Sequence, residues 1–367
     1  MRLAFDVTAL HDVRTGVGVV TGELLRRYAA TPDVDVTAYS VSWRGRDRVG
    51  KLVPAGVRVA KRPMAAQPLR QLWRRFDVPP IDWWTGAVDV VHGPNFVVPP
   101  SRGAAEIATV HDLTCVRYPE LCTADVLQYP GLVRRALRRG AHVHAVSRFV
   151  ADEVIAEFGA AADRVHVVPN GVSDVSGGDA ARGRQAAGGD RYVLALGTVE
   201  PRKDLPSLVA AFDAVAGFDP DLRLVLAGPD GWGAEQLAAA IDRASHRDRI
   251  ARIGWVDDTG RADLLAGATV FAYPSRYEGF GLPPLEAMAA GVPVVTTKAG
   301  ALPEVVGEAA TMVEAGDVDA LGAAISALVT EDPVTRSQRI AQGRARAAGF
   351  TWDAAAASLV GVYRSLC

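Results

Sequence analysis

The sequence Ser275-Arg276-Tyr277-Glu278-Gly279-Phe280-Gly281-Leu282-Pro283-Pro284-Leu285-Glu286-Ala287-Met288-Ala289-Ala290-Gly291 follows an apolar stretch at 270–273 that predicts a strand. It leads into a predicted helix over residues 283–290. Glycines let the backbone approach a ligand, and prolines suit the first turn of a helix, whose free N–H groups favour an anion. Seven residues separate Glu278, before the glycines, from Glu286, one turn inside the helix. The combination indicates a ligand site rather than two ordinary acidic residues.

Outward from this stretch, short apolar strands alternate with amphipathic helices, which predicts an α/β protein with parallel sheets covered on both faces. At 367 residues the chain suits two domains. We expect a first domain at 1–173, a flexible linker at 174–190 because that stretch is rich in glycine and alanine, and a second domain at 191–350. A final helix at 351–367 either completes the second domain or crosses back to the first.

Composition limits the class of protein. Apolar residues make up 49% and charged residues 22% of the chain, as in soluble globular proteins, and a net charge of −2 gives no electrostatic support for nucleic-acid binding. The three cysteines show no zinc-site spacing. The start lacks the apolar core of a signal peptide, and no apolar run is long enough to span a bilayer. These features predict a cytoplasmic protein without a metal site.

A second signal, residues 196–205, follows the first predicted strand of the second domain. Gly197 and Thr198 form a tight turn there, and the adjacent cations Arg202 and Lys203 precede a helix. Such a pair on a loop is commonly solvated, but open parallel sheets bind ligands at the carboxyl ends of their strands. Arginine can bind a diphosphate bidentately and lysine can act as a point charge, so we interpret the pair as anion-binding.

The first domain carries two weaker signals. Gly16 and Gly18, in Thr15-Gly16-Val17-Gly18, form either a plain strand-to-helix turn or a phosphate loop, since the third glycine of a dinucleotide motif is missing. His111 ends another predicted strand, where a histidine is either structural or part of a site. His92, which also ends a strand, is interpreted as structural or as part of an acceptor rim.

The segment 275–291 resembles the donor-site signature of the retaining GT-B glycosyltransferases of family four, in which seven residues separate two glutamates. Smaller matches at 146–148 and 168–172 extend the resemblance over nearly the whole chain. It implies two Rossmann-like, doubly wound domains that face each other across a cleft.

The resemblance also implies roles for single residues. Glu286 would hydrogen-bond the ribose hydroxyls of a nucleotide, and Glu278 would contact the transferred sugar. Arg202 and Lys203 match the family's diphosphate-binding loop, which begins at Gly197 and Thr198. The remaining donor contacts would be the backbone amides of Phe280, Gly281 and Leu282, the glycine loop of Gly16 and Gly18 on the phosphates, and His111 on the sugar.

The implied reaction is transfer of a hexose to a glycan or lipid-linked acceptor. The 197–203 turn is similar to that of bacterial mannosyltransferases, so GDP-mannose is the expected donor, and no cofactor is expected. No residue clearly serves as a carboxylate nucleophile, which favours front-face transfer in which cations replace a metal. Two alternatives stay open: a GT-B nucleotide-sugar epimerase or hydrolase, and a non-catalytic two-domain protein that binds sugar nucleotides.

Positive charge is concentrated in the first half of the chain. Residues 1–173 contain 22 lysines and arginines against 17 acids, and the remainder contains 18 against 25. Arginines lie beside Trp73 and Phe76 and gather again at 134–139. They form either a solvated face or a surface that contacts anionic lipid, which predicts peripheral membrane contact.

Overall fold

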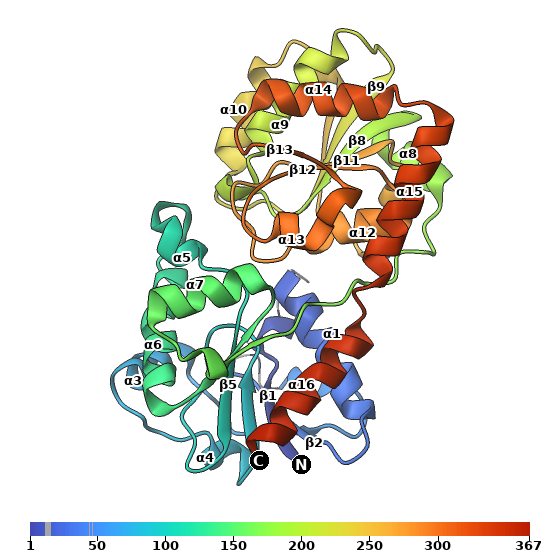
Figure 1. Cartoon of the computed structure of the whole chain (residues 1–367). Helices are drawn as coiled ribbons and strands as arrows, with labels where there is room; N and C mark the ends of the chain where they lie inside the picture. The colour runs from blue at the N-terminus through green and yellow to red at the C-terminus, as the bar shows by residue number, and fades with distance from the viewer. Residues whose placement is uncertain (12–15, 44, 46) are drawn as a thin grey trace. The chain divides into compact units, whose positions relative to one another are not determined.

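The computed structural model describes residues 1–11, 16–43, 45 and 47–367, which divide into two compact units. Unit 1 comprises Met1–Gly171 and Thr351–Cys367, and unit 2 comprises Val172–Phe350 (Figure 1). Thr15 of the predicted glycine loop lies outside the described residues, whereas Gly16 and Gly18 lie within them.

Unit 1 is built on a parallel sheet with the strand order β3-β2-β1-β4-β5-β6-β7. Its strands are β1 (Arg2–Asp6), β2 (Asp35–Tyr39), β3 (Arg58–Val59), β4 (Val90–Gly93), β5 (Ala105–Val110), β6 (His142–Ala145) and β7 (Val165–Val167). Its helices are α1 (Gly16–Ala30), α2 (Val49–Leu52), α3 (Ala66–Arg75), α4 (Asp82–Thr85), α5 (Thr114–Arg117), α6 (Tyr129–Arg139), α7 (Arg148–Phe158) and α16 (Trp352–Leu366). The strand order reverses between β1 and β4, where doubly wound sheets bind ligands.

Unit 2 repeats this plan with the order β10-β9-β8-β11-β12-β13, again parallel. Its strands are β8 (Arg191–Leu196), β9 (Leu222–Ala227), β10 (Ile250–Gly254), β11 (Val270–Tyr273), β12 (Val294–Thr297) and β13 (Thr311–Val313). Its helices are α8 (Ala180–Ala187), α9 (Leu205–Ala216), α10 (Ala234–Arg243), α11 (Asp258–Gly267), α12 (Leu282–Ala290), α13 (Leu302–Val306), α14 (Val318–Val329) and α15 (Pro333–Ala348). The order reverses between β8 and β11, the strands that precede the two loops singled out in the sequence.

The apolar strands of unit 2 explain its core. Every residue of β11 and β12 is buried, because helices cover both faces of the sheet, and the hydroxyls of the two threonines of β12 donate to backbone carbonyls. Phe212 of α9 and Ile325 of α14 are fully buried in the same cluster. The expected doubly wound α/β architecture is therefore confirmed for both units.

The stretch 174–190, expected to be a flexible linker, contains helix α8, which packs on α11. Gly178 and Gly183 lie against the backbone of α11, where an added Cβ would stand 2.1 Å from Ala262 O and 2.0 Å from Asp263 O. Arg182 Nε also contacts Asp263 Oδ2 at 2.7 Å. The linker prediction is wrong, because these glycines permit close helix packing rather than flexibility.

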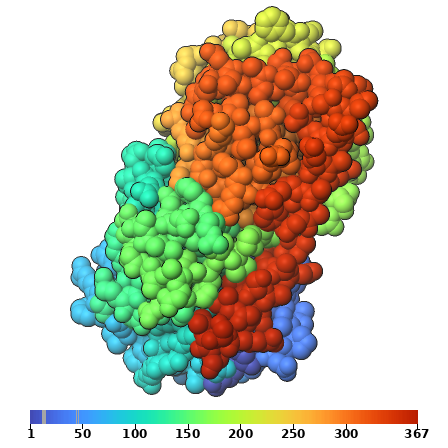
Figure 2. Space-filling model, viewed as in Figure 1, coloured from blue at the N-terminus to red at the C-terminus, as the bar shows by residue number. Residues whose placement is uncertain are grey.

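Helix α16 packs against α1 within unit 1, and its outer side forms part of the surface (Figure 2). The hydroxyl of Tyr363 is buried 2.8 Å from Tyr28 Oη and 2.6 Å from His92 Nδ1. His92 Nε2 lies 2.7 Å from Thr109 Oγ1. This buried polar chain joins α16 to β4 and β5, so His92 has the structural role that was one of its two interpretations.

Several short elements of unit 1 were not predicted. The sequence between residues 41 and 87 predicted no element, yet it forms β3 and helices α2 to α4. In unit 2, α15 was missed because its sequence is polar, with only Gly343 and Ala347 buried. Among the described residues, none of the helices combines the length and the apolar character needed to cross a bilayer.

Candidate functional site

The loop before α12 is shaped by close packing. Gly281 has φ +100°, and an added Cβ would stand 2.7 Å from Leu302 Cδ2, so this left-handed position favours glycine. Pro283 and Pro284 occupy the first turn of α12, where the missing N–H groups would have no helical partner. Phe280 is buried and packs edge-to-face on Phe350 with ring centroids 5.8 Å apart. The loop thus ends in a helix start whose first N–H groups suit an anion.

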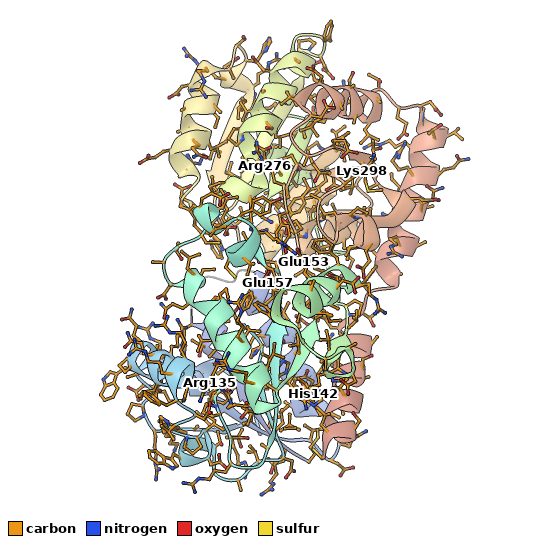
Figure 3. The ribbon with its side chains drawn as sticks, turned by 60° about the vertical axis from the view of Figure 1, so that its left-hand side comes forward. Arg135, His142, Glu153, Glu157, Arg276 and Lys298 are labelled. Carbon is orange, nitrogen blue, oxygen red and sulfur yellow. The ribbon has the colours of Figure 1, made fainter. Side chains whose placement is uncertain are left out.

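The cationic loop lies beside it in the same unit. Arg202 and Lys203 belong to the 3-10 turn Pro201–Lys203, which ends at Asp204 in the left-handed conformation with φ +49°. Arg276, labelled in Figure 3, makes two hydrogen bonds to this loop. Its backbone N–H donates to Arg202 O at 2.8 Å, and its side-chain Nε donates to Asp204 Oδ2 at 2.9 Å. These bonds join the two loops that the sequence separates by about 70 residues.

Glu278 is at the centre of the site, held by both cations. Lys203 Nζ donates to Glu278 Oε1 at 2.6 Å, and Arg202 Nη1 lies 2.9 Å from the same oxygen. Burial would raise the pKa of Glu278, but the charges of Arg202 and Lys203 outweigh it and lower the pKa to about 2. The carboxylate therefore stays ionised at every physiological pH, and its other oxygen takes part in neither contact.

Lys203 is itself buried, at 8% exposure. Its ammonium donates to Tyr273 Oη and lies 4.5 Å from the centre of the Tyr273 ring. Burial, with the charge of Arg202, lowers the pKa of Lys203 from its ordinary value, and Glu278 opposes that shift. A cation held this way is pre-positioned for an anion, because the protein has already removed most of its water.

Gly197 and Thr198 follow β8 directly, in the same loop as the two cations. With Lys203, Tyr273 and Pro274 they line one narrow pocket at the carboxyl ends of β8 and β11. Gly197 has φ +144°, and its carbonyl oxygen would stand 1.9 Å from a Cβ added at Gly228. The first loop therefore contributes both a turn and a cation to the same pocket.

The backbone of Glu278 is fixed by the loop after β12. Ala301 N donates to Glu278 O at 2.8 Å, and Gly300, at φ +59°, approaches so closely that an added Cβ would stand 2.1 Å from the same oxygen. A residue with a Cβ would clash with Glu278 O and would also be strained at this φ, so the position of Glu278 depends on glycine at position 300.

Gly300→Ala is accordingly expected to lower the midpoint of thermal unfolding by several degrees and to reduce turnover, because the Glu278 backbone must move. Gly316→Ala is the matched control: Gly316 has φ +84°, but nothing lies within 4 Å of its added Cβ. Alanine at a left-handed position costs about 1–2 kcal/mol through conformation alone. Equal effects of the two substitutions on stability and turnover would show that the Glu278 contact is unimportant.

Glu286 forms a second buried acidic group. It is 2% exposed, and Arg261 Nη1 of α11 lies 3.1 Å from Oε1 and 3.3 Å from Oε2. Burial is the main reason that the pKa of Glu286 rises to about 7; Arg261 lowers it and Asp258 raises it. The pKa values of the two glutamates of the motif are thus shifted in opposite directions.

The remaining candidates lie in unit 1. Gly16 is exposed at the first residue of α1, and Gly18, two residues later in the same first turn, is buried. His111 follows β5, and its Nε2 lies 2.7 Å from Pro94 O, which fixes the proton on Nε2 and leaves Nδ1 as an acceptor. Burial lowers the pKa of His111, so its ring is neutral near pH 7.

The structure brings together, in unit 2, Gly197, Thr198, Arg202, Lys203, Glu278 and the loop of Phe280, Gly281 and Leu282. Sequence reasoning missed Tyr273 and Arg261. Tyr273 ends the strand before the motif, so its place was open to inference. Arg261 had no signal, because a single arginine on an amphipathic helix is ordinarily solvated.

Family models match most of the chain. One described as "Glycosyltransferase Family 4" matches residues 14–175, and one described as "Glycosyl transferases group 1" matches residues 190–331.

Two curated mannosyltransferases are each 32% identical to this chain. The O-antigen chain mannosyltransferase B of Escherichia coli is 32% identical over 289 residues, covering 76% of this chain and 74% of that protein. The MMP alpha-(1->4)-mannosyltransferase of Mycolicibacterium hassiacum is 32% identical, covering 76% of this chain and 71% of that protein.

Solved structures share the fold at lower identity. WaaG, a glycosyltransferase involved in lipopolysaccharide biosynthesis, has a TM-score of 0.76 at 16% identity, covering 98% of this chain and 99% of its own. HepE from Anabaena, in complex with UDP and glucose, has a TM-score of 0.75 at 18% identity, covering all of both chains.

Proposed function

Because this chain belongs to the GT-B glycosyltransferases of family four, we propose that it transfers mannose from GDP-mannose to a glycan or lipid-linked acceptor, with retention of configuration and without a metal. The names of two mannosyltransferase relatives support the sugar. The observation that carries the proposal is the buried contact of Arg202 and Lys203 with Glu278 beside the narrow pocket.

The proposed step needs no enzyme nucleophile. The bond from the anomeric carbon to the diphosphate oxygen breaks while the acceptor oxygen bonds to that carbon on the same face. The acceptor proton passes to the departing phosphate oxygen. Lys203 and Arg202 stabilise the negative charge that grows on the diphosphate, the task that a metal performs elsewhere.

Glu278 fits a binding role better than a nucleophilic one. Two cations hold its Oε1, which lowers the electron density available for attack. Its other oxygen would accept hydrogen bonds from the transferred sugar. Glu286 would accept hydrogen bonds from the ribose, while Gly16 and Gly18 are assigned to the donor phosphates and His111 to the sugar.

A donor panel tests this function. EDTA-treated protein is incubated with GDP-mannose and with UDP-, ADP- and TDP-sugars, with and without a mannose-containing acceptor, and products are identified by NMR. We expect transfer from GDP-mannose, and an α-linked product. Free sugar or an epimer formed equally well without acceptor would indicate a hydrolase or an epimerase, and nucleotide-sugar binding with no product from any donor would indicate a binding protein.

We also propose that unit 1 contacts anionic membrane, through the segment from α3 to α4. Phe76, Val78 and Trp83 there are more than half exposed, and Arg74 and Arg75 end α3 beside them. The arginines of α6 contribute less than the sequence suggested. Arg134 contacts Glu157, labelled in Figure 3, at 2.7 Å, and Arg135 contacts Asp77 at 2.5 Å.

Trp83→Ser is expected to reduce co-sedimentation with anionic vesicles severalfold, because the interfacial tryptophan acts together with nearby cations. Each cation near an anionic bilayer adds about 1 kcal/mol. Trp255→Ser in unit 2 is the matched control, since both tryptophans are 53% exposed. Neutral vesicles and high salt should abolish binding of the wild type. Equal losses for both variants, or no binding to anionic vesicles, would leave this face as ordinary solvated surface.

A further inference from the structure

Arg261 lies where α11 meets α12, and nothing in the proposed reaction uses it. The helix is capped by Asp257, whose side chain accepts from Gly260 N, and Arg261 follows in the first turn. Nη1 reaches both oxygens of Glu286, and Nη2 lies 3.2 Å from Asp258 Oδ1. Among the described residues, its buried Nε has no hydrogen-bond partner. Burial of this guanidinium costs desolvation free energy, which its contact with Glu286 must offset.

We propose that Arg261 is a positioning residue that keeps the Glu286 carboxylate ionised and oriented toward the ribose diol, so that donor binding depends on pH through this pair. The inference rests on the proposed ribose role of Glu286. It adds a residue that does not itself touch the reacting atoms.

Geometry supports an orienting role. An ionised carboxylate has about four acceptor positions, two on each oxygen. Arg261 Nη1 approaches Oε1 and Oε2 almost equally, so it sets the direction in which the carboxylate faces and leaves acceptor positions on both oxygens. Two neighbouring ribose hydroxyls can donate to those positions. A protonated carboxyl would offer one hydrogen-bond donor and fewer acceptor positions, and it would bind the diol less well.

Electrostatics supplies the pH dependence. The pKa of Glu286 is raised to about 7 by burial, and Arg261 is the charge that opposes the rise. Asp258, on the same helix, acts in the other direction. On α15, Arg344 lies beside Gly291, at the far end of α12. Removing Arg261 therefore raises the pKa of Glu286 further, and the carboxylate ionises only at higher pH.

The test is calorimetric titration of GDP-mannose into wild type and Arg261→Met from pH 6 to 9. GDP-mannose suits this range because its diphosphate diester does not titrate there. We expect the affinity of the wild type to rise with pH and to level off above about pH 8. We expect Arg261→Met to bind about tenfold or more weakly at pH 7.5 and to recover much of that loss by pH 9.

Three further arms give the test its specificity. Arg261→Lys should keep most of the affinity, because the charge remains. The 2′,3′-dideoxy analogue should bind wild type and Arg261→Met alike at pH 7.5, since the diol that Glu286 recognises is absent. Arg243→Met, at an exposed position of α10, should behave as the wild type throughout.

A loss of affinity that is equal at every pH and equal for the dideoxy analogue would overturn the inference, because it would indicate a merely structural role. Wild-type affinity in Arg261→Met would overturn it as well. Glu286→Ala distinguishes a failure of the ribose role of Glu286 from a failure of the role of Arg261. If that variant binds GDP-mannose as the wild type does, the ribose role itself fails; if it binds weakly while Arg261→Met keeps the wild-type pH profile, only the role of Arg261 fails.

Discussion

Lys203→Met is expected to lower turnover by about 10²-fold or more, because a preorganised charge at the departing diphosphate stabilises the transition state more than the bound substrate. Binding of a nucleoside monophosphate should change far less, since the cation is assigned to the second phosphate. Steady-state rates, together with calorimetry of GMP and GDP, measure the two effects separately.

The control for this substitution is Lys298→Met. Lys298, labelled in Figure 3, is half-exposed and pairs with Glu314 at 2.8 Å, so its removal tests for a general effect of lost positive charge. Glu278 keeps Arg202 as a partner in Lys203→Met, at 2.9 Å from Oε1, and thermal unfolding checks that the variant is folded. Near wild-type turnover in a folded Lys203→Met would refute the leaving-group role.

Glu286→Ala is expected to weaken binding of GDP by about 1.5–3 kcal/mol, the usual value of hydrogen bonds to a charged acceptor. That loss corresponds to roughly 10- to 150-fold in the dissociation constant. Calorimetry at pH 8, where most of the carboxylate is ionised, measures it directly. Glu314→Ala, which removes an exposed carboxylate of the same unit, is the control. Unchanged affinity for GDP would rule out the ribose contact.

The pH dependence of the free energy of unfolding distinguishes this loss of binding from misfolding. The pKa of Glu286 is raised in the folded protein, to about 7, so its contribution to folding is present below its ordinary pKa and is lost as pH rises through 7. Glu286→Ala removes that contribution. Its deficit in the free energy of unfolding should therefore be smaller at pH 8 than at pH 4, although its nucleotide binding is weakest relative to wild type at pH 8.

The site residues that lie within single short segments could be predicted from the sequence. Residues 197–203 and 275–291 each contain a turn, a charge and a helix start, and both follow a strand of one parallel sheet. Because parallel strands have their carboxyl ends at one edge, such loops must lie together. Their convergence on Glu278 follows from sheet topology that the pattern of strands and helices already indicated.

Contacts between separate helices could not be predicted in this way. Arg261 precedes Glu286 by 25 residues on a different helix, and only the packing of α11 on α12 brings the two together. The helix α8 was missed for a related reason. Glycine favours flexible chain in isolation, and its value for close packing at Gly178 and Gly183 depends on a neighbour that the local sequence does not reveal.

Tyr363 of unit 1 shows the same limit. The sequence predicted the helix 352–366 and its terminal aromatic residues, but left open which domain it completes. The answer lies in polar partners distant in sequence, since the Tyr363 hydroxyl meets Tyr28 and His92. A buried histidine that ends a strand has the same local pattern whether it binds substrate or a structural tyrosine.

We propose that Arg202 and Lys203 hold a nucleoside diphosphate without a metal. Calorimetric titration of GDP and GMP into EDTA-treated protein tests it most directly. We predict that GDP binds at least tenfold more tightly than GMP, that added magnesium leaves this ratio unchanged, and that Lys203→Met reduces it. Equal affinity for the two nucleotides, or a preference for GDP that appears only with magnesium, would contradict the claim.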